Sequence, residues 1–251
     1  MENYPNIHVV DMHTWGEPLR IITAGYPKIE GDTILEKRRF VTQHLDHLRK
    51  FLMFEPRGHK EMYGALLVEP SQPNADIAVI FMHNDGYSAM CGLAVIALGR
   101  YALDEGLVEC HFPKTIVKIE CPCGLVQVEV DPITYESSFI SVPAFASILK
   151  QEIELESEKK EKVDIYYDRS AAGSITSRMA QAYASSIYHI GEKANFKNVV
   201  NSEFNPEIYP KNDLASLNEV QVKVTGKGFY IGHSTFFLDV GDELGKGFLF
   251  K

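Results

Sequence analysis

The stretch Asn84-Asp85-Gly86-Tyr87-Ser88-Ala89-Met90-Cys91-Gly92 joins an apolar segment at 77–82 to an alanine-rich apolar segment at 93–103. The first segment is typical of a buried strand and the second of a helix. A helix N-terminus presents unpaired N–H groups and a partial positive charge, which favour a thiolate over a thiol. The same N–H groups can bind a carboxylate. The stretch therefore predicts a small-acid site with a reactive Cys91 beside it; the alternative is inert packing, because cysteine is among the most buried residue types.

Length and composition limit the classes of protein to consider. The 251 residues fit one large domain or two small ones, and the formal net charge is −9. The acidic balance and the lack of a basic run along any predicted helix argue against a nucleic-acid partner. No apolar stretch has the length of a membrane span, residues 1–5 lack a signal-peptide pattern, and four cysteines do not suggest a disulfide scaffold. The sequence thus predicts a soluble cytoplasmic protein.

Alternation and turn residues predict a chain rich in strands. Thr33 and Glu36 form a capping box that opens a single helix, which Pro56 ends. One hairpin is predicted around Cys121-Pro122-Cys123-Gly124 and a second, over 219–239, around Gly226-Lys227-Gly228. The remaining predicted strands are 7–13, 19–24, 64–68, 76–82 and 139–145.

The chain divides into two predicted halves. The strand, glycine-containing turn and helix around Cys91-Gly92 are echoed around Ala172-Gly173, and a hairpin follows each unit. Residues 150–162 are rich in Glu and Lys with little periodicity, which is typical of a solvated linker. We expect an N-terminal half at 1–148, a linker at 149–163 and a C-terminal half at 164–251, whose last residues return to the first half.

Seven motifs of the chain are specific enough to indicate a family. They are Asp11-Met12-His13-Thr14-Trp15-Gly16-Glu17-Pro18-Leu19-Arg20, Phe54-Glu55-Pro56-Arg57-Gly58-His59, Met62-Tyr63-Gly64-Ala65, His83-Asn84-Asp85-Gly86-Tyr87-Ser88, Met90-Cys91-Gly92, Cys121-Pro122-Cys123-Gly124-Leu125-Val126 and Ser141-Val142-Pro143-Ala144-Phe145. These motifs resemble the proline racemase family, and most of all its trans-3-hydroxy-L-proline dehydratase branch. The match is dense over residues 7–145, resumes at Asp168-Arg169-Ser170 and Arg178-Met179-Ala180, and is looser towards the C-terminus.

The resemblance implies an α+β fold of two pseudo-symmetric halves, similar to diaminopimelate epimerase. Each half wraps a curved, mostly antiparallel sheet around a central helix, and the substrate binds between them. The resemblance also implies a homodimer that uses no metal or organic cofactor. Racemases of the family place one cysteine on each face of the substrate α-carbon. The dehydratases replace the second cysteine with threonine, so that one cysteine takes the α-proton and the 3-hydroxyl leaves as water.

The chain departs from the family pattern in five respects. Trp15 stands where glycine is usual, and Leu93 replaces the histidine that follows Cys91-Gly92. Ala171 replaces a proline, and Ala172 stands where racemases have cysteine and dehydratases have threonine. A block of the second half is missing between about Ile165 and Asp168, so the second half is expected to be incomplete. Because Ala172 carries no titratable group, we expect no two-base racemase or epimerase activity.

The predicted reaction is therefore the dehydration of a hydroxyproline-like imino acid, with Cys91 as the base. The backbone N–H groups of Gly92, Leu93, Gly173 and Ser174 would bind the substrate carboxylate. Asp168 would pair with the ring ammonium, or else cap the second helix. The competing hypothesis is an inactive member of the family that binds a small imino acid or acts only as a structural or interaction protein.

Other polar residues are expected to be structural. His13 and His83 read as turn or strand-end residues rather than catalytic groups. His44 and His47 lie three residues apart on a predicted helix, but two ligands without a third make a weak metal site. The spacing of Cys110, His111, Cys121 and Cys123 fits a zinc site poorly, so no metal is expected.

Overall fold

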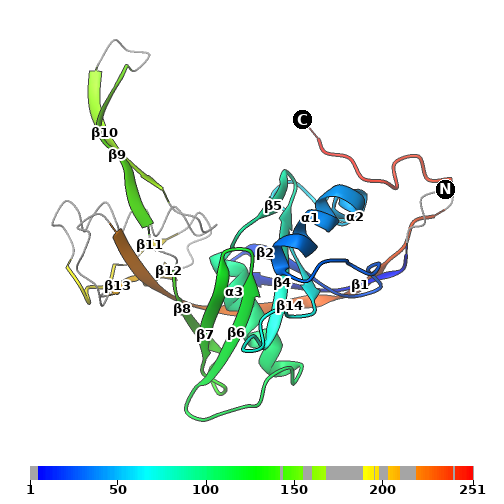
Figure 1. Ribbon diagram of the computed structural model, residues 1–251, viewed down its shortest axis with the longest axis horizontal. Helices are drawn as coiled ribbons and strands as arrows, with labels where there is room; N and C mark the ends of the chain where they lie inside the picture. Colours follow the sequence, from blue (N-terminus) through cyan, green and yellow to red (C-terminus); the bar gives the residue numbers. More distant parts are fainter. Residues whose placement is uncertain are drawn as a thin grey trace. The chain divides into compact units, whose positions relative to one another are not determined.

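The computed structural model describes residues 5–141, 144–154, 160–167, 189–194, 196–197, 203–209, 219–239 and 241–250 (Figure 1). The chain forms two compact units. Unit 1 comprises Met1–Ser137 and Gly226–Lys251, and unit 2 comprises Ser138–Thr225. The C-terminal segment of the chain thus packs with the N-terminal residues in unit 1.

Unit 1 is built on a mostly antiparallel sheet with three helices, α1 (Ile34–His44), α2 (Asp46–Met53) and α3 (Gly92–Asp104). Its strands follow the order β14-β1-β2-β3-β4-β6-β7, with β5 paired to β4. The pairs β2–β3 and β4–β6 are parallel and the others are antiparallel. The bounds are β1 Ile7–Thr14, β2 Glu17–Ala24, β3 Tyr63–Val68, β4 Ile77–His83, β5 Gly86–Ser88, β6 Thr115–Cys121, β7 Gly124–Val130 and β14 Glu219–Phe236.

The apolar run before the Cys91 stretch is a central strand, as predicted. Six consecutive residues of β4 are buried, so both faces of the strand are covered. Ala78, Ile80 and Met82 join one hydrophobic cluster with residues of α1 and α2. Because side chains alternate along a strand, the residues between them face the other side of the sheet. This double burial explains why β4 reads as a continuous apolar run rather than an alternating one.

The helix predicted from the Thr33 capping box is two helices. The capping box itself is confirmed, because the Thr33 side chain accepts from Glu36 N–H and the Glu36 carboxylate binds the Thr33 N–H. The chain then breaks at Leu45, whose φ of −126° and ψ of 13° end α1 and begin α2. Asp46 in the first turn of α2 complements the positive end of that helix. Asp46, which lies inside an apparently continuous helical pattern, therefore marks the start of a second helix.

The second predicted hairpin, over 219–239, is wrong, because β14 runs without a turn from Glu219 to Phe236. Its glycines allow close contacts instead of a reversal. A Cβ on Gly226 would lie 2.1 Å from the Trp15 ring, and one on Gly228 would lie 2.7 Å from the Cα of Ala97 in α3. β14 can therefore pair with β1 while α3 and the Trp15 ring pack directly on its backbone.

Replacing Gly228 with alanine is expected to destabilise unit 1 by about 1–3 kcal/mol, because the new methyl group overlaps the α3 backbone. Gly232→Ala, in the same strand, has nothing within 4 Å of its Cβ and is the matched control. Urea unfolding followed by circular dichroism would measure both. Equal midpoints for the two variants would contradict the close approach of α3 to β14.

The described part of unit 2 also consists of strands. The order is β8-β14-β9-β10, with β13 paired to β14 and a separate pair β11–β12. The bounds are β8 Glu136–Ile140, β9 Ala144–Glu154, β10 Lys160–Tyr167, β11 Phe196–Lys197, β12 Glu203–Phe204 and β13 Glu207–Tyr209. The single strand predicted over 139–145 is thus the end of β8 and the start of β9. The second helix predicted near Ala172 lies outside the described residues.

The segment predicted as a solvated linker, 149–163, is largely an antiparallel pair. β9 and β10 face each other with Lys160 opposite Glu154 and Lys162 opposite Glu152. Opposite charges at facing register positions favour pairing, so a composition rich in Glu and Lys is compatible with two paired strands as well as with a linker.

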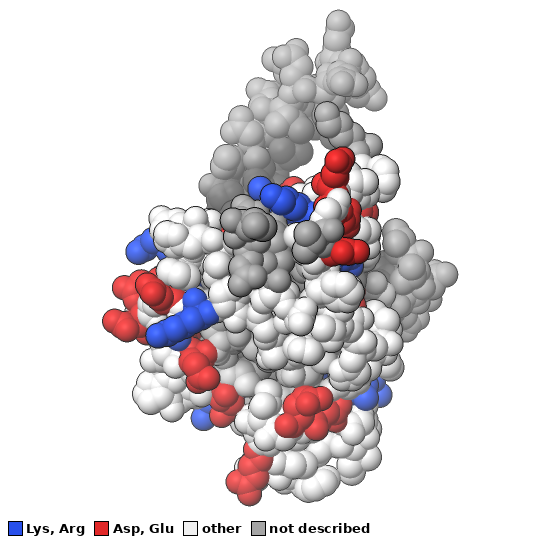
Figure 2. Space-filling model, turned by 90° about the vertical axis from the view of Figure 1, so that its right-hand side faces the viewer, with Lys and Arg blue, Asp and Glu red and all other residues white. Residues whose placement is uncertain are grey.

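The predicted α+β class is confirmed only in part. The described residues of unit 1 form a mixed, mostly antiparallel sheet with few helices, of which α3 contacts β1, β2, β6 and β7. The finer description of two pseudo-symmetric halves stays a prediction. The face in Figure 2 carries isolated Lys and Arg side chains among groups of Asp and Glu, as expected from the net charge of −9.

Candidate active site around Cys91

Cys91 is the N-cap residue of α3, as the sequence predicts. Its backbone is extended, with φ −136° and ψ 111°, and its carbonyl accepts the first helical hydrogen bond from Val95 N–H at 3.0 Å. The N–H groups of Gly92, Leu93 and Ala94 therefore precede the regular hydrogen bonding of the helix. β4 and β5 deliver the chain to this point through the turn at Asn84 and Asp85.

The predicted lowering of the Cys91 pKa is not found. The residue is only 6% exposed, and burial raises the pKa of the thiol to about 11. The thiol makes no regular capping hydrogen bond, yet the N–H groups of Ala94 and Leu93 and the Tyr63 hydroxyl lower this pKa in part, while Glu17 raises it. Desolvation outweighs the effect of the helix terminus, so the Cys91 thiol is protonated at neutral pH.

Tyr63 acts directly on Cys91, and Ser88 is hydrogen-bonded to Tyr63; neither residue is predicted as a site residue from the sequence. Tyr63 begins β3, Ser88 ends β5, and their hydroxyl groups form a hydrogen bond. Burial raises the pKa of Tyr63, and the nearby Cys91 raises it further. Tyr63 therefore stays protonated and can donate a hydrogen bond to a Cys91 thiolate while accepting one from Ser88. Tyr63 of β3 pairs with His83 of β4, and Ser88 of β5 pairs with Phe81 of β4, so the strand pairing brings Tyr63 and Ser88 together.

The β1–β2 hairpin is tied to the start of α3. Thr14 Oγ1 donates to the Leu93 carbonyl at 2.8 Å, and Thr14 is 1% exposed. The two turn residues that follow, Trp15 and Gly16, have φ values of 52° and 93°. Glycine suits this left-handed conformation and tryptophan does not, which explains why glycine is expected at position 15. The Trp15 ring packs on Gly226.

The buried Arg49 and the partly buried Asn84 hold the Asn84-Asp85 turn in place. Arg49, 5% exposed, donates to the carbonyls of His83 and Asn84 at 2.8 and 2.5 Å and forms an ion pair with Asp46. The Asn84 amide donates to the Met53 carbonyl at 2.9 Å. These bonds fix α2 to the turn that leads into β5 and Cys91. The turn at Asn84 and Asp85 therefore helps to position Cys91.

The two candidate histidines have structural contacts, as expected. His13 Nδ1 accepts from Gly16 N–H, and His83 Nδ1 accepts from Asp85 N–H, both at 3.2 Å. Each ring thus closes the hairpin turn that follows it. Burial lowers the pKa of His83, so this ring is neutral at physiological pH.

The structure places only part of the predicted site. Cys91, Gly92 and Leu93 lie together at the start of α3. Asp168, Gly173 and Ser174 lie outside the described residues, as do Ala171 and Ala172. Of the four residues predicted to bind the carboxylate, only Gly92 and Leu93 are therefore among the described residues.

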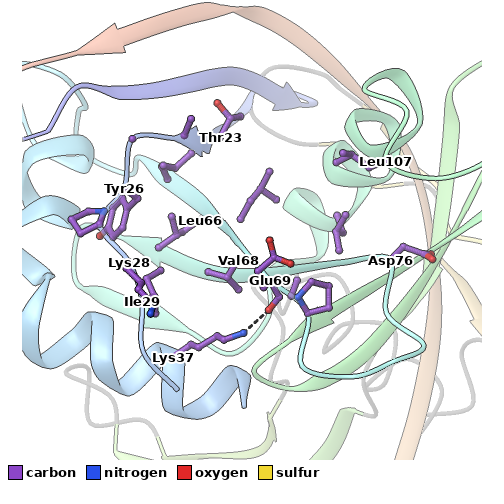
Figure 3. A pocket seen from close by; sticks show the side chains of 18 residues that line it. Thr23, Tyr26, Lys28, Ile29, Lys37, Leu66, Val68, Glu69, Asp76 and Leu107 are labelled. Atoms are coloured by element: carbon purple, nitrogen blue, oxygen red, sulfur yellow. Dashed lines mark hydrogen bonds between the residues drawn. The ribbon is translucent and has the colours of Figure 1, made fainter. Parts of the chain in front are cut away.

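A pocket of about 590 Å³ lies elsewhere in unit 1, and its lining does not include Cys91, Tyr63 or Ser88 (Figure 3). It opens where β2 and β3 diverge after their short parallel pairing. Lys37 crosses its rim and donates to the Glu69 carbonyl at 2.6 Å. The pocket therefore adds no residue to the Cys91 site.

Among the described residues, no group of three or more His, Cys, Asp or Glu side chains is placed to share a metal ion.

The helices within the described ranges are all too short or too polar to cross a bilayer.

The pH dependence of Cys91 alkylation is expected to reflect its burial. Because iodoacetamide reacts with the thiolate, the rate of Cys91 alkylation should rise with pH and reach half its maximum at about pH 11. Tyr63→Phe removes a hydrogen bond that favours the thiolate, so the curve should move to higher pH. Peptide mass spectrometry separates Cys91 from the exposed Cys110. A midpoint below the ordinary thiol pKa, or no shift in Tyr63→Phe, would contradict this account.

The site and the sheet around α3 correspond to a known family. The sequence profile described as proline racemase matches residues 9–167 and again 165–249. The chain belongs to the proline racemase family. Its fold also matches a solved hydroxyproline epimerase from Agrobacterium vitis with bound trans-4-hydroxy-L-proline, with a TM-score of 0.85 and 21% identity over 98% of this chain and 95% of that chain.

Several relatives carry the name trans-L-3-hydroxyproline dehydratase. The Saccoglossus kowalevskii protein is 58% identical over 159 residues, or 62% of this chain and 49% of that protein. The Xenopus tropicalis protein is 35% identical over 334 aligned positions, which cover 98% of this chain and 96% of that protein. The chain thus spans about half the length of the Saccoglossus protein and of several mammalian relatives. The profile match in two segments agrees with the predicted internal shortening.

Proposed function

We propose that this chain acts as a trans-3-hydroxy-L-proline dehydratase, a hydro-lyase in which Cys91 removes the α-proton. The single observation that carries the proposal is a cysteine at the N-terminus of α3 with the Tyr63 hydroxyl beside it, which is itself hydrogen-bonded to Ser88. Relatives of this name, 58% and 35% identical, support the substrate assignment.

The proposed chemistry begins at the α-carbon of the bound imino acid. The Cys91 thiolate takes the α-proton, the C2–C3 double bond forms, and the 3-hydroxyl leaves as water after gaining a proton. The resulting enamine then takes a proton at C3 and loses the proton on its ring nitrogen, which gives a cyclic imine. Because the free thiol has a pKa of about 11, its thiolate is a strong base but a rare species at neutral pH. Tyr63, Leu93 N–H and Ala94 N–H stabilise that thiolate when it forms.

The remaining predicted residues complete the proposed site. The N–H groups of Gly92, Leu93, Gly173 and Ser174 would bind the carboxylate, and Asp168 would pair with the ring ammonium. A second half similar to the first, a homodimer, the absence of a cofactor and a cytoplasmic location also belong to this proposal. The family resemblance and the composition support them.

Incubation of the purified chain with trans-3-hydroxy-L-proline tests the activity, with the imine trapped by o-aminobenzaldehyde. We expect coloured product from this substrate. We expect no stereochemical change at the α-carbon of L-proline or trans-4-hydroxy-L-proline, because Ala172 supplies no second base. Absence of imine from folded protein would contradict the proposal and favour an inactive member of the family.

A further inference from the structure

The turn between β6 and β7 holds two thiols side by side, outside the residues assigned to the reaction. Cys121 ends β6 opposite Gly124, and Pro122 and Cys123 form the turn. The two sulfur atoms are 3.3 Å apart, and Cys121 Sγ is also 3.3 Å from the Gly124 carbonyl oxygen. Cys121 is fully buried, Cys123 is partly accessible, and neither is in a disulfide.

The two cysteines have different acidities. The Cys121 thiol donates towards the Cys123 sulfur, which lowers the pKa of Cys123, and the same contact together with burial raises the pKa of Cys121. Cys123 therefore ionises more readily than Cys121 and is the more accessible of the two. This is the arrangement of an attacking and a resolving thiol.

The turn is also connected to the candidate active site. The Cys123 N–H donates to the Ala89 carbonyl at 3.1 Å, and Ala89 lies two residues before Cys91. A change in the backbone at Cys123 therefore acts on the loop between β5 and α3.

We propose that Cys121 and Cys123 form a reversible dithiol–disulfide modification site whose oxidant is a peroxide. The Cys123 thiolate attacks one peroxide oxygen and becomes a sulfenic acid, and the other oxygen leaves as hydroxide. The Cys121 sulfur then attacks the Cys123 sulfur. The S–S bond forms, and the sulfenic hydroxyl leaves as water with the Cys121 proton. Two thiols are thereby oxidised and one peroxide is reduced.

Formation of the bond must alter the turn. The sulfur atoms must move from 3.3 Å to a bonding distance of about 2.05 Å, and Pro122 restricts the backbone between them. A disulfide in so small a loop is strained, and strained disulfides are readily reduced. The same movement is expected to weaken the Cys123–Ala89 hydrogen bond and so to change the environment of Cys91.

Hydrogen peroxide treatment of the full chain, followed by N-ethylmaleimide and peptide mass spectrometry, tests the site. The peptide that contains both cysteines should lose two hydrogen atoms, carry no maleimide and return to the dithiol form with dithiothreitol. In Cys121→Ala, Cys123 should instead be trapped as a sulfenic acid by dimedone. Cys110→Ser, which removes an exposed thiol, is the matched control and should leave the disulfide unchanged.

Two outcomes would overturn the proposal. The first is a Cys121–Cys123 peptide that still carries two maleimide groups at a peroxide dose that oxidises Cys110. The second is that Cys121 and Cys123 form disulfides with Cys110 or with another chain, but not with each other. Alkylation of Cys91 by iodoacetamide tests the connection to the site without any activity assay. The rate should change by about twofold to tenfold on oxidation, corresponding to the loss of one hydrogen bond, and an unchanged rate would refute the connection.

Discussion

Cys91→Ser is expected to lower the rate of imine formation from trans-3-hydroxy-L-proline by at least about 10²- to 10⁴-fold, to the background of the assay. The serine side chain has the shape of the cysteine side chain and is smaller, so it introduces no clash and the start of α3 should stay intact. A hydroxyl is a far weaker acid than a thiol, however, and cannot supply an anionic base beside the substrate at any accessible pH. Trapping with o-aminobenzaldehyde at saturating substrate measures the loss.

The control for this substitution is Cys110→Ser, which replaces an exposed cysteine that is not part of the site. It should keep the rate of the unmodified chain, and both variants should show the same circular dichroism spectrum. If Cys91→Ser and Cys110→Ser were equally active, Cys91 would not be the base, and the proposed reaction would need another group.

The sequence predicted the parts of the fold that depend on local pattern. The fully apolar β4, the Thr33 capping box, the β6–β7 hairpin and the helix after Cys91 were all found where expected. In each case the residues that define the element lie within a few positions of one another, so periodicity and turn chemistry were sufficient.

The errors arose where a distant partner determined the structure. Gly226 and Gly228 are glycines because Trp15 and Ala97 pack on them, and neither partner is close in sequence. The Cys91 pKa was predicted from the helix terminus alone, whereas burial by the rest of unit 1 exceeds that effect. Tyr63 was missed because only the pairing of β3 with β4 and of β4 with β5 brings it to Ser88. The sequence offered one indication of its role, because Tyr63 carries a hydroxyl group and directly precedes the strand predicted over 64–68, within the motif Met62-Tyr63-Gly64-Ala65.

The substitution with the largest expected effect on stability is Arg20→Met, which should lower the free energy of unfolding by about 3–5 kcal/mol. Arg20 is 5% exposed and forms a two-point ion pair with Asp11, with both contacts at 2.9 Å. Its remaining N–H groups donate to the carbonyls of Leu52 and Arg57 at 2.8 and 2.7 Å. One guanidinium thus connects β1 and β2 to α2 and to the loop after it.

Methionine matches the length of Arg20 but satisfies none of its partners, so the Asp11 carboxylate and two carbonyl groups would lose their donors. Arg20→Lys retains the charge but not the planar fork, and its loss should be intermediate. Arg39→Met, at an exposed position of α1, is the matched control and should stay within about 0.5 kcal/mol. Guanidinium unfolding of the three variants decides the question. If Arg20→Met lost less than about 1 kcal/mol while Arg39→Met was unaffected, the Asp11–Arg20 pair would contribute no more than a surface ion pair does. The presence of this pair would then need a functional explanation.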